Sequence, residues 1–225
     1  MTIRDTETTE NPETGLLRIK QSKTCVILFT LIVFALSGLY LRFAWNRYND
    51  EASTKAIMLA QSLETLLQHQ QIAALSGGAE DLAKPEYNVT KISLTRLVGS
   101  KNPIEFAYLM GERDGKIVFL IDSESPESPD YSPPGQVYDE ADNETWEPFK
   151  SGKTILSEPA TDRWGTWISA LVPIKDPADG RVIAVLGLDY AASEWYANLW
   201  QRMIPDLIIV LCALSLFFAL LYTWK

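Results

Sequence analysis

The segment 163–195 reads RWGTWISALVPIKDPADGRVIAVLGLDYAASEW, and it decides the fold. Its two apolar runs, 164–174 and 181–189, are rich in β-branched and aromatic residues and enclose the turn sequence KDPADG. This arrangement predicts an antiparallel hairpin. Both runs are apolar on their two faces, which is typical of strands that are covered on both sides of a sheet.

A second hairpin is predicted upstream, where the runs 104–110 and 116–121 flank the turn GERDG. The segment 123–135 contains four prolines and is therefore expected to be a loop that leads from one hairpin to the other. A short helix at 142–150 and a short strand at 154–157 are expected along the same connection.

Helices are expected on either side of the strands. Apolar residues at three- and four-residue spacing predict one long helix over 46–75, which Ser76-Gly77-Gly78 ends. A shorter helix is expected at 91–98, and another helix begins near residue 192. Strands with helices before and after them predict an α+β fold with an antiparallel sheet covered on both faces.

Two uncharged apolar runs of 18 residues, 24–41 and 207–224, lie outside this region. A helix of that length covers about 27 Å, close to the thickness of the hydrocarbon core of a bilayer. The first run has 23 mostly polar residues before it and no A-x-A site after it, which favours an uncleaved span over a cleaved signal peptide. For the second run, the alternative is a buried helix of a soluble protein.

The predicted layout is a disordered cytoplasmic tail at 1–23, a span at 24–45, an extracytoplasmic domain at 46–202 and a second span at 203–224. Long loops translocate largely regardless of their charge, so the 157 residues between the spans are placed outside the cytoplasm of an inner-membrane protein. The lipid bilayer is accordingly one predicted partner.

The composition excludes several kinds of site. The chain carries 29 acidic and 20 basic residues, a net charge of −9 that is unfavourable for holding nucleic acid. One histidine and two cysteines, Cys25 and Cys212 inside the spans, cannot build a His/Cys zinc site or a disulfide framework. His69 is expected at a solvated helix position. Gly152-Lys153-Thr154 lacks the upstream glycine of a phosphate-binding loop, because that position is Glu147. We expect no catalytic residue, no metal and no cofactor.

A candidate ligand pocket follows from strand alternation. Asp189 ends an otherwise apolar strand and shares a face with Gly187, so its carboxylate needs a protein donor or a ligand cation as partner. Trp167 and Ser169 are expected beside it, on one face of the preceding strand together with Arg163. Five further residues are candidates to complete the pocket: Tyr108, Asp122, Tyr131, Tyr138 and Trp146. The alternative is that the aromatic residues are core and that Asp189 caps the following helix.

The motifs FAYLMGERDGKIVFLIDS, SPPG and DRWGTWISALVPIKDPADGRVIAVLGLD, followed by a tryptophan, resemble the single Cache (PDC, PAS-like) extracytoplasmic sensor domain. Such domains occur in sensor histidine kinases and diguanylate cyclases. The resemblance covers about 46–202. It implies a long N-terminal helix, a five-stranded antiparallel sheet and a small-molecule pocket over one face of the sheet.

The resemblance implies a membrane-anchored sensor that transmits ligand binding to a cytoplasmic histidine kinase or diguanylate cyclase, placed after Lys225 or on a partner. Receptors of this type usually work as homodimers through their long helices, so a homodimer and a small-molecule ligand are the expected partners. The alternative function is a membrane-anchored binding or assembly module without a pocket.

Overall fold

The computed structural model describes residues 12–99 and 102–223, with side chains from residue 23 onward. The chain divides into two compact units. One unit is the domain Tyr48–Gln201. The other consists of two helical arms, one that ends at Arg47 and one that begins at Arg202. The predicted tail at 1–11 lies outside the described residues, but residues 12–23 are helical, so the prediction of disorder was wrong for that part.

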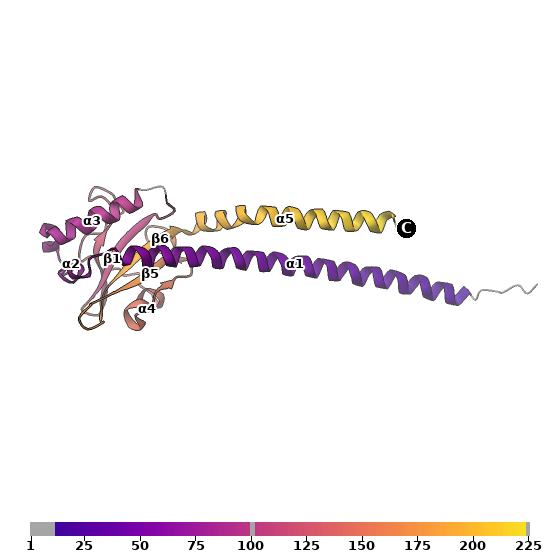
Figure 1. Cartoon of the computed structure of the whole chain (residues 1–225), viewed down its shortest axis with the longest axis horizontal. Helices are drawn as coiled ribbons and strands as arrows, with labels where there is room; N and C mark the ends of the chain where they lie inside the picture. The colour runs from indigo at the N-terminus through magenta and orange to yellow at the C-terminus, as the bar shows by residue number, and fades with distance from the viewer. Residues whose placement is uncertain (1–11, 100–101, 224–225) are drawn as a thin grey trace, which may run out of the picture. The chain divides into compact units, whose positions relative to one another are not determined.

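An antiparallel sheet forms the centre of the domain (Figure 1). Its strands follow the order β2-β1-β6-β5-β3, so the two predicted hairpins lie side by side and are joined through the β1–β6 pair. These are the five strands predicted, and a further two-residue strand, β4, lies off this path and pairs with the start of β5. The strands are β1 (Phe106–Arg113), β2 (Lys116–Asp122), β3 (Ile155–Leu156), β4 (Ala160–Thr161), β5 (Thr166–Lys175) and β6 (Val182–Ala191).

Within residues 12–99 and 102–223, six helical elements accompany the sheet. They are α1 (Pro12–Glu64), α2 (His69–Ala73), the 3-10 helix η1 (Ala79–Ala83), α3 (Pro85–Val98), α4 (Asn143–Ser151) and α5 (Ala192–Thr223). Helix α4 begins as predicted, because Asp142 is its N-cap and forms a capping box with Thr145. Helix α3 begins six residues before its predicted start, with Pro85 at the first helical position, where the missing N–H costs nothing.

The long helix ends at Glu64, earlier than its predicted end at residue 75. A turn separates it from α2, and His69 opens that second helix. The His69 imidazole bridges two elements, since Nδ1 lies 3.1 Å from the Lys175 carbonyl oxygen and Nε2 lies 2.8 Å from Glu64 Oε1. The prediction of a simply solvated His69 was therefore wrong. Helical periodicity runs through both helices and does not reveal the turn.

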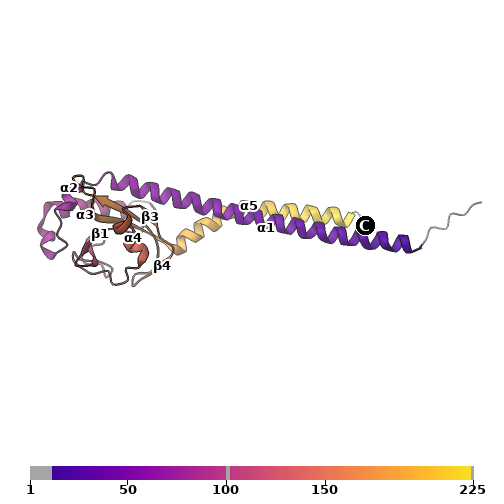
Figure 2. The same cartoon turned by 90° about the horizontal axis from the view of Figure 1, so that it is seen from below.

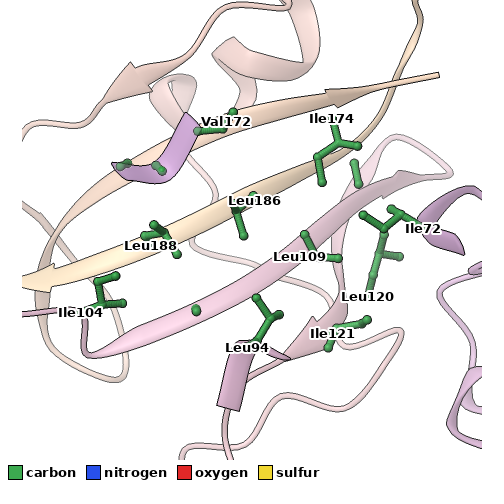
Figure 3. Packing of buried hydrophobic residues seen from close by; sticks show 14 of the residues in the cluster. Ile72, Leu94, Ile104, Leu109, Leu120, Ile121, Val172, Ile174, Leu186 and Leu188 are labelled. Carbon is green, nitrogen blue, oxygen red and sulfur yellow. The ribbon is translucent and has the colours of Figure 1, made fainter. Parts of the chain in front are cut away.

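Both faces of the sheet are covered, as predicted. The larger core packs α1, α2 and α3 against one face; its buried side chains include Leu94, Leu109, Leu120, Leu186 and Leu188 (Figure 3). On the other face, Met110, Phe119 and Val185 pack against Trp146 and Phe149 of α4. Helices α3 and α4 accordingly lie on opposite sides of the strands (Figures 1 and 2).

The two arms are apolar and exposed. Their most apolar 18-residue windows have mean hydropathies of 2.4 and 2.6, and only 0% and 6% of those windows are buried. The arms contact each other through the ring pairs Phe29–Phe217 and Phe34–Phe218, and Tyr40 donates a hydrogen bond to Asp206. Both helices are long and apolar enough to cross a membrane.

Candidate ligand-binding pocket

A pocket opens on the α4 side of the sheet, between the ends of β1, β5 and β6 and the long connection that follows β2. Its enclosed volume is about 30 Å³, and the space reaches about 390 Å³ when the open mouth is included. The residues that line it are Phe106, Tyr108, Met110, Phe119, Asp122, Asp130, Ser132, Tyr138, Asp162, Trp164, Trp167 and Asp189.

Tyr108 and Gly187 form the floor, and they are paired across β1 and β6. A Cβ atom on Gly187 would lie 2.1 Å from Cε2 of the Tyr108 ring, so the ring occupies the space that any other side chain at 187 would fill. In this position, the Tyr108 hydroxyl donates a hydrogen bond of 2.9 Å to Asp189 Oδ1. The glycine thus permits the contact that holds the carboxylate.

Asp189 is one of two buried carboxylates in the lining, with 6% of its surface exposed against 4% for Asp122. It pairs with Phe106 on β1 and with Ser169 on β5, and the Ser169 side chain is its second hydrogen-bond donor. Burial raises the pKa of Asp189 to about 7, although both hydrogen bonds act to lower that pKa. Burial also raises the pKa of Tyr108 well above its ordinary value, so the phenol stays protonated as the donor.

Asp162 organises the aromatic side of the pocket. Its Oδ1 accepts hydrogen bonds from the Trp164 and Gly165 backbone N–H groups, at 2.9 and 3.1 Å, and from Trp167 Nε1 at 3.0 Å. Its Oδ2 accepts a hydrogen bond of 3.2 Å from the Tyr138 hydroxyl. One carboxylate therefore fixes the turn before β5 and orients two aromatic rings of the wall. Burial, the largest cause, raises the pKa of Tyr138.

Asp122 lies at the end of β2, opposite Tyr108 in register. Its Oδ1 accepts from the Glu124 N–H at 3.1 Å and its Oδ2 from the Ser132 N–H at 2.7 Å, so it ties both ends of the Pro-rich loop to the sheet. Burial raises the pKa of this carboxyl group. Asp130, in contrast, is exposed at the rim of the pocket.

Aromatic rings make up half of the lining. The Phe119 ring meets the rings of Tyr108, Tyr138 and Trp164 at centroid distances of 5.6, 5.8 and 5.9 Å and at angles of 74°, 67° and 83°. Phe106 and Trp167 meet at 5.0 Å and 77°. Such edge-to-face contacts are the favoured arrangement of aromatic pairs. They give the wall a fixed shape.

The charge of the lining has one sign. Four aspartates line the pocket, and none of the described lining residues is a lysine, an arginine or a histidine. The Lys91 ammonium acts on Asp122 and the Arg163 guanidinium acts on Asp162 from outside the lining. Aromatic walls with four carboxylates still favour a positively charged occupant.

Five of the residues predicted from the sequence line this pocket together: Tyr108, Asp122, Tyr138, Trp167 and Asp189. Ser169 supports Asp189 from the neighbouring strand. The other two lie elsewhere. Arg163 precedes β5 and forms a bidentate ion pair with Glu140, at 2.7 and 2.6 Å, above the Trp164 ring. Trp146 packs on Phe149 and under the Lys150 ammonium group.

Two of the alternatives to a pocket role, the capping of α5 by Asp189 and a core position for Tyr131, can be compared with the contacts of these residues. The carboxylate of Asp189 receives hydrogen bonds from strands β1 and β5, which is a different role from capping α5. Tyr131 is outside the lining, and its hydroxyl lies 3.2 Å from that of Tyr87 while the Lys91 ammonium lies over its ring. Tyr131 therefore fastens the loop to α3.

Sequence reasoning missed seven lining residues: Phe106, Met110, Phe119, Asp130, Ser132, Asp162 and Trp164. Phe106 and Met110 alternate with Tyr108 along β1, so the period of two could have placed them on the pocket face. Asp162 begins the sequence DRWG, in which an aspartate can accept bonds from the next backbone N–H groups, a usual turn signal. No local signal identifies Asp130 or Ser132.

No family model and no curated protein matches the chain. Among solved structures, it is similar to the ligand-binding domain of the Campylobacter jejuni chemoreceptor Tlp3 in complex with L-valine, with 23% identity and a TM-score of 0.44 over 77% of this chain and 65% of that one. The sensory domain of the same receptor with isoleucine bound gives 22% identity and a TM-score of 0.44, over 77% and 64%.

The chain is also similar to the extracellular domain of mmHK1S-Z2, a protein described as a histidine kinase, with 15% identity and a TM-score of 0.31 over 66% of this chain and 61% of that one. It thus spans less than two thirds of each of these three solved chains.

Proposed function

We propose that this chain is the sensor part of a membrane receptor and that its pocket binds a small molecule carrying a positive charge. The observation that supports the proposal is the composition of the lining, which contains four aspartates and, among its described residues, no lysine, arginine or histidine. Burying carboxylates such as Asp122 and Asp189 is costly, and a cationic ligand offsets that cost.

Ligand binding is expected to change the contacts at the beginning of α5, because β6 continues into this helix without a linker. Asp189 faces the pocket, and Tyr190 follows on the opposite face of β6, buried in the larger core. The Tyr190 ring contacts Trp195 at 5.7 Å, and Trp195 Nε1 donates a 3.3 Å hydrogen bond to Asn49 of α1. Two consecutive residues thus connect the pocket with the beginning of α5 and with α1. A ligand that prefers one arrangement of this contact shifts the population of receptor states.

The proposed topology places the spans at 24–45 and 203–224 and the domain 46–202 outside the cytoplasm. The exposed apolar surfaces of both arms support it. The proposed output is a histidine kinase or a diguanylate cyclase module. A homodimer through the long helices is part of the proposal and has some support in Met58 and Leu59 of α1, which are 61% and 37% exposed.

A thermal-shift assay of the full chain in detergent micelles tests the proposed ligand class. The probes are methylammonium chloride, tetramethylammonium chloride, sodium acetate and acetamide, each against sodium chloride at the same ionic strength. Stabilisation by at least one ammonium ion, absent with acetate and acetamide, supports the proposal. Stabilisation by acetate alone, or by none of the four probes, contradicts it.

A second function, an assembly module that needs no ligand, is favoured by one observation. The enclosed part of the pocket, about 30 Å³, has room for about two water molecules. In that case the aromatic residues serve as core, and the same assay gives no shift with any probe while a partner protein supplies the stabilisation.

A further inference from the structure

We propose that the domain takes a second input, the acidity of the surrounding medium, through a proton that His69 holds between the end of α1 and the turn that joins β5 to β6. The proposal is independent of the proposed ligand, because His69 is not one of the residues that line the pocket. It follows from what the two nitrogens of the imidazole ring face.

Both ring nitrogens of His69 face hydrogen-bond acceptors. Nδ1 lies 3.1 Å from the carbonyl oxygen of Lys175, and Nε2 lies 2.8 Å from Glu64 Oε1. A carbonyl oxygen and a carboxylate can only accept hydrogen bonds, while a neutral imidazole carries one N–H group and an imidazolium ion carries two. Both contacts are therefore hydrogen bonds only when His69 is protonated.

The local structure makes this position favourable for a cation. Helix α1 ends at Glu64, and its last residues, 61–64, read QSLE without a basic side chain. A positive charge beside the C-terminus of a helix is stabilised by the helix dipole. On the other side of the ring, the register of β5 against β6 shifts between Ile174 and Lys175, so the Lys175 carbonyl oxygen lies where the regular ladder is interrupted and a side chain can reach it.

The other charged and titratable groups of the neighbouring elements are directed elsewhere. Lys84 donates to the carbonyl oxygen of Ala74, and Arg113 donates to those of Leu75 and Ser76. The Lys175 ammonium lies 3.3 Å from the place of a Cβ atom on Gly152, close to the end of α4. Among the described residues, the Glu64 carboxylate is the group that forms an ion pair with the ring. Further such groups around α2 are Tyr87, Glu112, Asp114, Lys153, Asp176 and Arg181.

Loss of the proton leaves one N–H group for two acceptors. The carboxylate is the stronger acceptor, so the remaining proton stays on Nε2 and faces Glu64. Nδ1 then presents a lone pair to the Lys175 carbonyl oxygen, and two acceptors 3.1 Å apart repel each other. The contact between α2 and the turn after β5 is therefore the one that opens when the medium becomes alkaline.

This contact acts on the same helix as the proposed ligand signal. Helix α1 is continuous from Pro12 to Glu64, and Trp195 contacts it at Asn49 (Figure 1). Histidine is the side chain whose ordinary titration lies between about pH 5 and 8, and His69 is the only histidine of the chain. The proton at His69 and the ligand at Asp189 thus bias α1 at two different positions.

A double-mutant cycle on the full chain in micelles tests the proposal. Wild type, His69→Gln, Glu64→Gln and the double variant are unfolded by urea at about pH 5.5 and about pH 8. Asp189 is present in all four proteins, so its own titration cancels in the cycle. We expect the coupling of the two positions to change the unfolding equilibrium constant by about fivefold at the lower pH, the scale of a half-exposed ion pair, and by at most about twofold at the higher pH.

A coupling that is equal at both pH values, or absent at both, overturns the proposal, because a neutral histidine in a purely structural role gives that result. Glu51→Gln is the matched control, since Glu51 pairs with Lys55 on the same helix. Its effect on stability should be the same at both pH values, and a change with pH as large as that of Glu64→Gln overturns the assignment to His69.

The position of the remaining proton can be observed directly. Labelling with ¹⁵N-histidine gives nuclear magnetic resonance signals from the two ring nitrogens of His69 alone, because the chain has no other histidine. In the folded chain we expect both nitrogens to be protonated at about pH 5.5 and only Nε2 at about pH 8. A proton on Nδ1 at the higher pH contradicts the opening of the contact with Lys175.

Discussion

Replacing Asp189 by asparagine is expected to stabilise the domain above neutral pH while it weakens the binding of cations. Asp189 is almost fully buried, and burial raises its pKa from 3.8 to about 7. Because the folded-state pKa is raised, the group contributes most to stability below about pH 4, where it is protonated in both states, and that contribution is lost as the pH rises through about 7.

The size of the effect follows from the shift. Each pKa unit corresponds to about 1.4 kcal/mol, so keeping Asp189 ionised in the folded state costs up to about 4 kcal/mol. Asparagine removes this cost. The hydrogen bonds from Tyr108 and Ser169 already act to lower the pKa, so their effect on the charged form is contained in the shift. The variant is therefore expected to be more stable than the wild type by up to about 4 kcal/mol near pH 8.

Urea unfolding of the full chain in micelles, followed by near-ultraviolet circular dichroism at about pH 5 and about pH 8, measures this difference. The stability of the wild type relative to Asp189→Asn should fall between the two pH values. Asp130→Asn is the matched control, because Asp130 is exposed and its removal should leave the pH dependence unchanged. A difference between wild type and Asp189→Asn that is independent of pH would falsify the reasoning from burial.

Other predictions concern the floor, the pH dependence, the outlying arginine and the topology. Gly187→Ala places a Cβ atom 2.1 Å from the Tyr108 ring and should destabilise the domain by about 1–3 kcal/mol, as overpacking does, with loss of methylammonium binding; a normal urea midpoint and normal affinity contradict this. Methylammonium affinity, measured by calorimetry, should fall by up to tenfold per pH unit below about 7, because the cation competes with the proton on Asp189, and a flat profile opposes that account. Arg163→Ala should leave this affinity unchanged, since Arg163 pairs with Glu140 outside the lining; a tenfold loss puts it back in the site. Asp179→Cys, with Cys25 and Cys212 replaced by alanine, should react with an impermeant maleimide in intact cells, and labelling only after lysis reverses the topology.

The strand pattern of the sequence predicts most of the sheet, and the reasons are local. The runs around KDPADG and GERDG carry enough β-branched and aromatic residues to identify four strands and their turns. Helix ends were harder to predict. The turn after Glu64 is stabilised by contacts of His69 with Lys175, a residue more than one hundred positions away, which a helical period cannot reveal.

The pocket was predictable where alternation along one strand decides it, as for Asp189, Tyr108 and Trp167. It was not predictable where a loop folds back on the sheet. Asp162 lines the pocket because two of its hydrogen bonds close the turn before β5 and a third holds the Trp167 indole. In the same turn, Arg163 pairs with Glu140. The assignment of Arg163 to the face of Trp167 assumed that the strand begins earlier than Thr166.

The most direct test of the central proposal compares the methylammonium affinities of the wild type and Asp189→Asn at about pH 8, by calorimetry on the full chain. Removing the charge while keeping the shape of the side chain should weaken binding by about tenfold or more, since contacts of a charged group contribute about 1.5–3 kcal/mol. Urea unfolding of the same samples establishes that the sheet is intact. Equal affinity in the two folded proteins would contradict the assignment of Asp189 as the charge that binds the ligand.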